Sequence, residues 1–423
     1  MKNKIILTIL MGICSFTLAA QQRYTLEQCR KLALENNIRV KNSRLEIKSA
    51  HQTQKEAFTN FFPKVSASGN WFNANKALLN MQLAPGMEIS MLKNGLLGGV
   101  TATQPIFAGG QIVNGNKLAK LGVEVSGYQM EQSEKEVLLT TEQYYRQIIS
   151  LQEKLKTIEI VEQLVNSLYK DVETAVKAGV NNRNDLLQVQ LKRNSVTSNR
   201  LQVENGLSIC KMLLGQYIGL EQDNFSIETT PFDELSSPEI YKTDHNSALI
   251  KTPEYQLLNK SVEASHLQKK IAAGKYMPTV GIGAGYMYDN LMDKDHPFGI
   301  VFTTISVPIS DWWGGSHTIK KQNLQTTIAE NNRKNSSDLL IIQMQKLWND
   351  LTESYKQVKL AEESVITATE NVRLNTDYYK AGTVTLSDLL DSQMLLQQSR
   401  DQYTDVYMQH LVKQTQYLQA TGR

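Results

Sequence analysis

Residues 379 to 390 read Tyr-Lys-Ala-Gly-Thr-Val-Thr-Leu-Ser-Asp-Leu-Leu, and the chain contains a shorter copy of this stretch. The copy begins with Lys177-Ala178-Gly179, and in both places an Asp-Leu-Leu triplet starts six residues after the glycine. The two glycines are 203 residues apart, as are Pro105 and Pro308. Matched landmarks in the same order and at the same separation indicate that the chain consists of two repeats.

A very long helix is predicted before each of these glycines. The segment from Ser316 to Ala381 contains no Gly and no Pro, and at about 1.5 Å per residue it would be roughly 100 Å long. From Tyr144 to Ala175, apolar residues recur in steps of three and four, which indicates a coiled-coil seam. The glycines end these helices, and shorter helices return over about 184–217 and 387–419. A filamentous or scaffolding coiled coil is the alternative that the helices alone leave open.

Four stretches follow a period of two instead, which predicts β-strands over residues 64–73, 98–107, 279–289 and 299–309. Each has about 9 to 11 residues, the length of a tilted transmembrane strand. A strand in lipid needs every backbone group paired, and a closed barrel needs at least about 8 strands. Four strands cannot close alone, so a membrane form requires several copies, and three copies would supply 12 strands. A soluble sheet that covers one helix face is the alternative.

The amino terminus predicts export from the cytoplasm. Lys2 and Lys4 precede an apolar run from Ile5 to Leu18, and small residues follow, so we expect a signal peptide over residues 1–20. The remaining cysteines, Cys29 and Cys210, would be free to pair in an oxidising compartment, although spacing alone does not show that they do.

Composition and motifs argue against two other classes of protein. The formal net charge is only +3 and no cluster of basic and aromatic residues is present, so nucleic acid is not an expected partner. The histidines are scattered without metal-ligand spacing, and no nucleophile or phosphate-binding motif is found. We therefore expect no enzymatic activity, no cofactor and no metal site.

Taken together, the motifs resemble those of the TolC family of outer-membrane factors. The motifs are Tyr24-Thr25-Leu26-Glu27-Gln28 near the start, Pro-Ile-Phe-Ala-Gly-Gly at 105–110, and the stretch 379–391. The resemblance implies a mainly α-helical protein with a membrane β-barrel portion. Repeats over 21–220 and 251–423 would flank a connecting segment over 221–250. It further implies a homotrimer with a helical barrel and a 12-stranded β-barrel. Implied partners are outer-membrane lipid, a periplasmic adaptor and an inner-membrane pump of the RND or ABC type, so that the chain would be a passive export duct.

The resemblance also assigns roles to residues at the periplasmic entrance. Asp388 and Asp391 match positions that form an acidic ring, and their spacing of three puts them on one helix face. Mutual repulsion in such a ring would raise some of the carboxylate pKa values. The alternative is that these acids, and Asp185 as well, act as caps in the first turn of a helix.

Two further sets of entrance residues are implied in the same way. Tyr379 and Asp185 match a pair that latches the closed state in the family, although the latch arginine is replaced by Val384. Gly179 and Gly382 match the turn tips that receive the adaptor, and Lys177 and Lys380 lie beside them. The transported substrate cannot be read from the sequence.

Overall fold

The structure is a computed structural model that describes residues 23–220, 225–229, 232–291 and 294–423. The predicted signal peptide lies outside the described residues, as do six residues of the connecting segment, 221–224 and 230–231. The chain forms two compact units. Unit 1 comprises residues up to 43, 131–252 and 339–423, and unit 2 comprises 44–130 and 253–338. Each repeat therefore contributes to both units.

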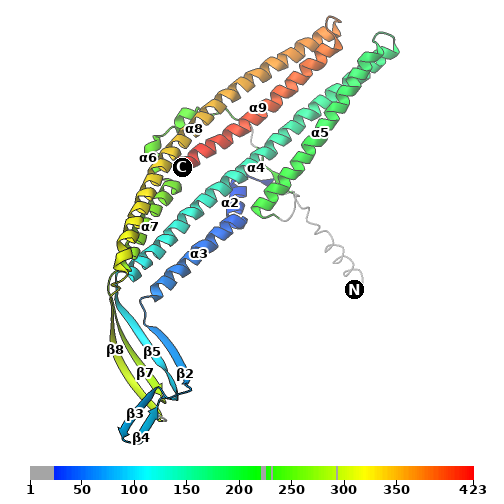
Figure 1. Cartoon of the computed structure of the whole chain (residues 1–423). Helices are drawn as coiled ribbons and strands as arrows, with labels where there is room; N and C mark the ends of the chain where they lie inside the picture. The colour runs from blue at the N-terminus through cyan, green and yellow to red at the C-terminus, as the bar shows by residue number, and fades with distance from the viewer. Residues whose placement is uncertain (1–22, 221–224, 230–231, 292–293) are drawn as a thin grey trace, which may run out of the picture. The chain divides into compact units, whose positions relative to one another are not determined.

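Four long helices dominate the fold (Figure 1). They are α4 (Gln111–Lys177), α5 (Arg183–Ile218), α8 (Trp312–Lys380) and α9 (Leu386–Ala420). In unit 1, α5 returns along α4 to form what we call the first hairpin, and α9 returns along α8 to form the second hairpin. The predicted long helices are confirmed, and α5 and α9 each begin and end within one residue of the prediction. The helix α8 starts earlier than predicted, at Trp312, because its two glycines fall in its first turn, where Gly315 packs against the ring of Tyr276.

The remaining elements of unit 1 lie near the ends of α5 and α9 that are away from the turns. They are β1 (Arg23–Tyr24), α2 (Leu26–Asn36), the start of α3 (Ile38–Thr59), β6 (Ser226–Ile227), the 3-10 helix η1 (Pro238–Tyr241) and α6 (His245–Leu249). One apolar cluster joins Cys29 and Ala33 of α2 to Ile148 of α4, Leu214 of α5 and Tyr407 of α9. Cys29 and Cys210 both lie at this cluster as free thiols.

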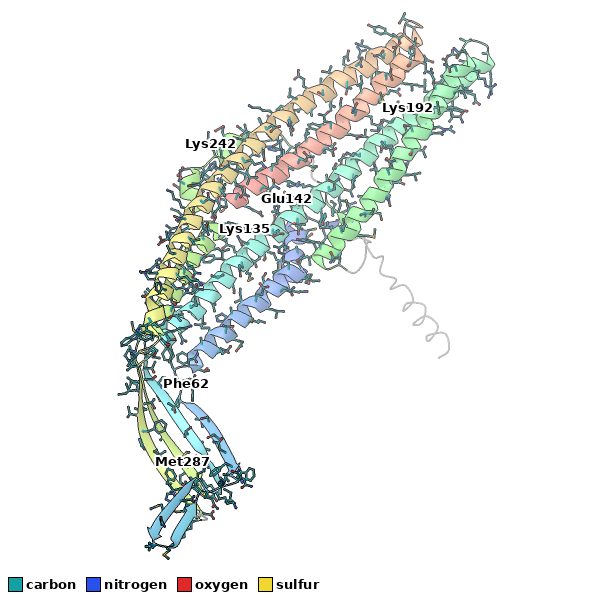
Figure 2. All side chains as sticks on the ribbon, in the orientation of Figure 1. Phe62, Lys135, Glu142, Lys192, Lys242 and Met287 are labelled. Carbon is teal, nitrogen blue, oxygen red and sulfur yellow. The ribbon has the colours of Figure 1, made fainter. Side chains whose placement is uncertain are left out.

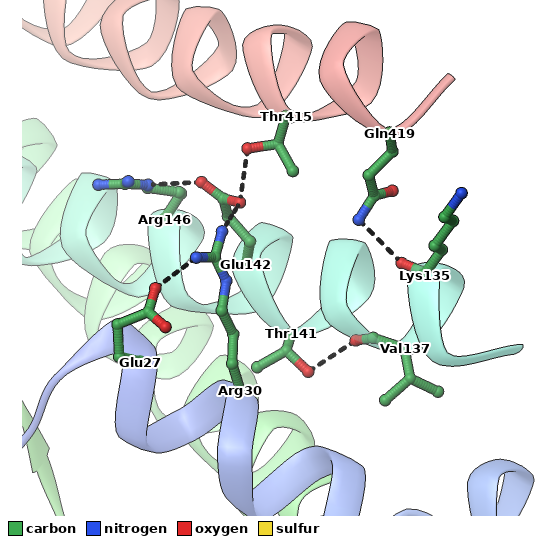
Figure 3. A network of polar contacts seen from close by, with 9 residues as sticks. All are labelled: Glu27, Arg30, Lys135, Val137, Thr141, Glu142, Arg146, Thr415 and Gln419. Carbon is green, nitrogen blue, oxygen red and sulfur yellow. Dashed lines mark hydrogen bonds and ion pairs between the residues drawn. The ribbon is translucent and has the colours of Figure 1, made fainter. Parts of the chain in front are cut away.

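A buried carboxylate joins three helices in unit 1 (Figure 3). The side chain of Glu142 on α4 is 2% exposed. It forms ion pairs with Arg30 of α2 at 2.7 Å and Arg146 of α4 at 3.3 Å. The hydroxyl of Thr415 on α9 donates to the same carboxylate at 2.8 Å. A buried charge is stable only when it is paired and hydrogen-bonded, so this network fixes α2 and α9 against α4.

Unit 2 contains a four-stranded antiparallel sheet (Figure 1). Its strands, in spatial order, are β2 (Lys64–Asn73), β5 (Asn94–Ala108), β7 (Thr279–Asp289) and β8 (His296–Ser306). The helix α7 (Pro253–Gly274) leads toward β7. The two repeats therefore meet in the centre of the sheet, where β5 pairs with β7. The outer edges of β2 and β8 have no partner strand within the described chain.

Two strands differ in their bounds from the prediction. The strand β5 begins at Asn94 rather than at residue 98, because Asn70 to Asn73 at the end of β2 pair with Asn94 to Leu97. The strand β8 covers His296–Ser306 rather than 299–309, because His296 pairs with Asp289 and Pro308 has no N–H for the ladder. The predicted bounds of β2 and β7 are correct.

The segment between β2 and β5 contains a short β-hairpin that the sequence analysis did not predict. The strand β3 (Leu79–Ala84) pairs with β4 (Met87–Met91) across a turn at Gly86.

Candidate functional site

The turns that end the two helical hairpins have matching backbones. Gly179 and Gly382 have φ of 73° and 74°, the left-handed conformation that favours glycine. The next N–H in each case, that of Val180 and that of Thr383, donates to a carbonyl five residues earlier, at 2.9 Å in both turns. Nothing lies within 4 Å of a Cβ placed at either glycine. The predicted tips are therefore open surfaces of unit 1.

The helices that follow these turns are capped by different side chains. Asn182 precedes α5, and its side-chain oxygen accepts from the N–H of Asp185 at 3.0 Å. Thr385 precedes α9, and its hydroxyl accepts from the N–H of Asp388 at 3.2 Å. The Asp388 carboxylate in turn accepts from the N–H of Thr385 at 2.9 Å and from its hydroxyl at 2.6 Å. Asp388 thus completes a reciprocal capping box.

The two acids predicted for the ring have different surroundings. The hydrogen bonds from Thr385 hold the pKa of Asp388 below its ordinary value, the opposite direction to the shift expected from repulsion in a ring. Asp391 lies on the same helix, is exposed, and takes no part in the cap. The capping role is therefore present at Asp388. A ring would use the exposed carboxylate of Asp391 and whichever oxygen of Asp388 the cap leaves open.

The predicted latch residues lie in one unit, but the described residues show no hydrogen bond between them. The carboxylate of Asp185 accepts from the amide of Asn181 at 3.2 Å. Tyr379 packs against an apolar cluster at this end of unit 1, and Val384 is half-buried. That cluster includes Val189 of α5 with Leu386 and Leu389 of α9, so it joins the two hairpins. The Tyr379 and Asp185 latch stays a prediction.

The lysines beside the tips are solvent-exposed. Lys177 pairs with Glu173 one turn earlier at 3.3 Å, and its side chain is 73% exposed. Lys380 ends α8 and is exposed. A role for either lysine in adaptor contact stays a prediction.

The sheet of unit 2 has one apolar face and one mixed face, on which Ile300 and Phe302 of β8 lie beside the hydroxyl-bearing residues of β2 and β5. The pairing register puts Val65, Val100, Tyr286 and Val301 on one face, and these side chains are 50% to 85% exposed. The other face carries Ser66 and Thr101, whose hydroxyls lie 3.1 Å apart. A sheet with an exposed apolar face, backed by a face that carries hydroxyl groups, matches the wall of a membrane barrel.

Two kinds of feature were sought among the described residues: membrane-spanning helices and metal-binding groups. Among them, no helix is both long and apolar enough to cross a bilayer, and no group of three or more His, Cys, Asp or Glu side chains could hold a metal ion.

These features agree with a family match over most of the chain. The model of the outer membrane efflux protein family matches residues 29–219 and 245–423, close to the two predicted repeats. The chain belongs to this family, so the predicted TolC-type resemblance is confirmed, and the outer membrane is its location. No curated protein matches the sequence.

Several solved outer-membrane channels share the fold at low sequence identity. The Campylobacter jejuni CmeC channel is 15% identical with a TM-score of 0.80, covering 94% of this chain and 85% of CmeC. The Vibrio cholerae protein VceC is 13% identical with a TM-score of 0.78, covering 94% of this chain and 96% of VceC. The Neisseria gonorrhoeae MtrE channel is 13% identical with a TM-score of 0.76, covering 94% of this chain and 88% of MtrE.

Proposed function

We propose that the protein is the outer-membrane duct of a tripartite export system. In this proposal three copies close one β-barrel in the outer membrane, and their helical hairpins form a tunnel through the periplasm. The observation that carries the proposal is the sheet of unit 2. It has an exposed apolar face and edge strands, β2 and β8, that have no partner within the described chain.

The directions of the strands allow several copies to close one barrel. Successive strands of the sheet are antiparallel, and the sheet has an even number of strands. The edges β2 and β8 therefore run in opposite directions, so β2 of one copy can pair antiparallel with β8 of the next. Pairing of this kind removes the exposed edges, which lipid does not tolerate.

The duct has no energy source of its own in this proposal. An inner-membrane pump supplies the free energy, and a periplasmic adaptor binds the open entrance better than the closed one, thereby shifting its population. The turn tips at Gly179 and Gly382 are the proposed adaptor contacts, since both are open surfaces. Asp388 and Asp391 are the proposed acidic ring, which would favour cations over anions.

Membrane extraction and cross-linking test the assembly. The protein should stay with the outer membrane through salt and urea washes, and detergent should release an oligomer that dissociates on heating. Amine cross-linking of that oligomer should stop at the mass of three chains. Recovery of a monomer in the soluble periplasmic fraction would exclude the duct and favour a scaffold.

A further inference from the structure

The mixed face of the unit 2 sheet, opposite the exposed apolar side chains, changes in character from strand to strand. On β2 and β5 this face carries hydroxyl groups, those of Ser66 and Thr101 among them. On β8 the same face is apolar at three successive positions. They are Phe298, Ile300 and Phe302, and Met287 of β7 pairs with the first of them. We call these four residues the inner track.

The side chains of the inner track lie across neighbouring strands, where glycine leaves room for them. Phe302 pairs with Gly283, and a Cβ atom at Gly283 would collide with the phenyl ring. Met287, labelled on the sheet in Figure 2, covers Gly99 in the same way, since a Cβ there would lie 2.6 Å from Sδ. All four side chains of the track nevertheless stay half-buried or exposed. The track is therefore an open apolar strip along the sheet and not a plug.

The proposed barrel determines what can reach this strip. The opposite face, whose apolar side chains are 50% to 85% exposed, faces lipid, and the edge strands β2 and β8 pair with other copies. The inner track then borders the lumen, where it meets water and the molecule in transit. Contact between apolar surface and water is unfavourable, and a molecule that covers the track gains free energy in proportion to the apolar area removed from water.

The neighbours of the track favour a molecule with two kinds of surface. Ile300 shares a row across the sheet with Ser66 and Thr101. In the closed barrel, β2 of the next copy would lie on the other side of β8, so polar groups flank the track on both sides. From Phe298 to Phe302 the track is about 13 Å long, at about 3.3 Å per residue. It is long enough for a flat aromatic ring system or a short alkyl chain.

We propose that the inner track binds amphiphilic molecules while they pass through the barrel. Their aromatic or alkyl part lies on the track, and their polar part faces the hydroxyl groups and water. Each copy has one track, so three copies would line the lumen with apolar strips separated by polar ones. This inference rests on the proposed duct function and adds the class of substrate to it.

Current noise from single channels in planar bilayers tests the track with two neutral probes. Umbelliferyl glucoside carries a flat aromatic group and methyl glucoside does not, while both carry the same sugar. Transient binding of a probe in the lumen adds noise to the ion current. The aromatic probe should reach half-maximal noise at a concentration about tenfold or more below that of methyl glucoside. Equal concentrations for the two probes would overturn the track.

A pair of double variants on β8 compares its two faces. Ile300→Thr with Phe302→Thr removes apolar surface from the track and should raise the half-maximal concentration of the aromatic probe by about three- to tenfold. Val301→Thr with Ile305→Thr is the matched control, because those side chains lie on the opposite face of the same strand and are 85% and 68% exposed. It should leave that concentration unchanged. Phe302→Leu, which keeps an apolar side chain, should keep most of the binding.

The outcomes that would overturn the track differ from the one that would overturn the duct. Equal shifts from the two double variants would show that the inner face has no special part in binding. A higher conductance of Ile300→Thr with Phe302→Thr, together with unchanged probe binding, would show that these residues form a constriction instead. Absence of conductance in the unchanged protein would overturn the duct, and the track with it.

Discussion

The turn that joins α4 to α5 and the turn that joins α8 to α9 share a left-handed glycine, with φ of 73° and 74°, and the same pattern of carbonyl hydrogen bonds. Their side chains differ at matched positions. Asn182 corresponds to Thr385, and Gln188 corresponds to Asp391. The repeats have kept what the backbone requires and have diverged in charge. Function specific to one hairpin should therefore lie at the diverged positions.

The largest difference in stability effect between the hairpins is expected for substitutions of Glu142 and of its counterpart Gln345, 203 residues later. Glu142 is buried and paired with two arginines, whereas Gln345 is exposed and bonds only to Asn349 of its own helix, at 2.9 Å. Glu142→Ala leaves Arg146 without its acid and Arg30 with Glu27 alone, and since both arginines are partly buried it should lower the free energy of unfolding by about 3 kcal/mol, the low end of the range for breaking a buried pair. Gln345→Ala should change it by under about 0.5 kcal/mol. Denaturant unfolding in detergent, followed by circular dichroism, compares the two, and equal losses would show that the network in Figure 3 is not stabilising.

Removal of the two helix caps should change the free energy of unfolding by amounts that differ less from each other. Thr385→Ala removes a reciprocal box and Asn182→Ala removes a single accepted bond, so the first should cost about 1–2 kcal/mol and the second about 0.5–1 kcal/mol. Amide hydrogen exchange in the first turns of α9 and α5 measures each loss locally. Faster exchange at α5 than at α9 after the matched substitutions would reverse the expected order.

The smallest effect should be a pH dependence of the stability that arises from the second hairpin alone. Burial raises the pKa of Asp401 to about 6; Lys154 on α4 lowers it and Asp405 on α9 raises it. The folded state then holds this proton more tightly than the unfolded state, so stability is lost as the pH rises from about 4 to about 6. Asp401→Asn should raise the melting temperature by about 1–3 °C at neutral pH and leave it unchanged near pH 4.

Ser198 is the matched control for this comparison, because it occupies the corresponding exposed position of α5. Ser198→Ala should melt like the unchanged protein at every pH. A gain for Asp401→Asn that is equal at acidic and neutral pH would contradict the proposed titration.

The elements in which a regular hydrophobic pattern continues without interruption were predicted from the sequence. The helices α5 and α9 and the strands β2 and β7 were located within a residue, because capping residues and alternation mark their ends. The end of β8 was displaced because Pro308 was taken as part of the strand, although it lacks the N–H that the ladder needs. The β3 and β4 hairpin was missed because its strands are short and joined by an irregular register.

The site was predictable only in part, for a physical reason. Acids and glycines near a turn are visible in sequence: the repeat located Gly179 and Gly382, and the family resemblance singled out Asp388 and Asp391. Whether an acid caps a helix or faces another helix depends on its three-dimensional neighbours, so the capping box of Asp388 emerged only from the structure.

Ion flow through purified protein in a planar bilayer tests the central claim most directly. If several copies share one barrel, stepwise and uniform conductance increments should appear, carried mainly by cations, and Asp388→Ala with Asp391→Ala should reduce that preference. A monomer in detergent that produces no conductance steps at any protein concentration would contradict the account.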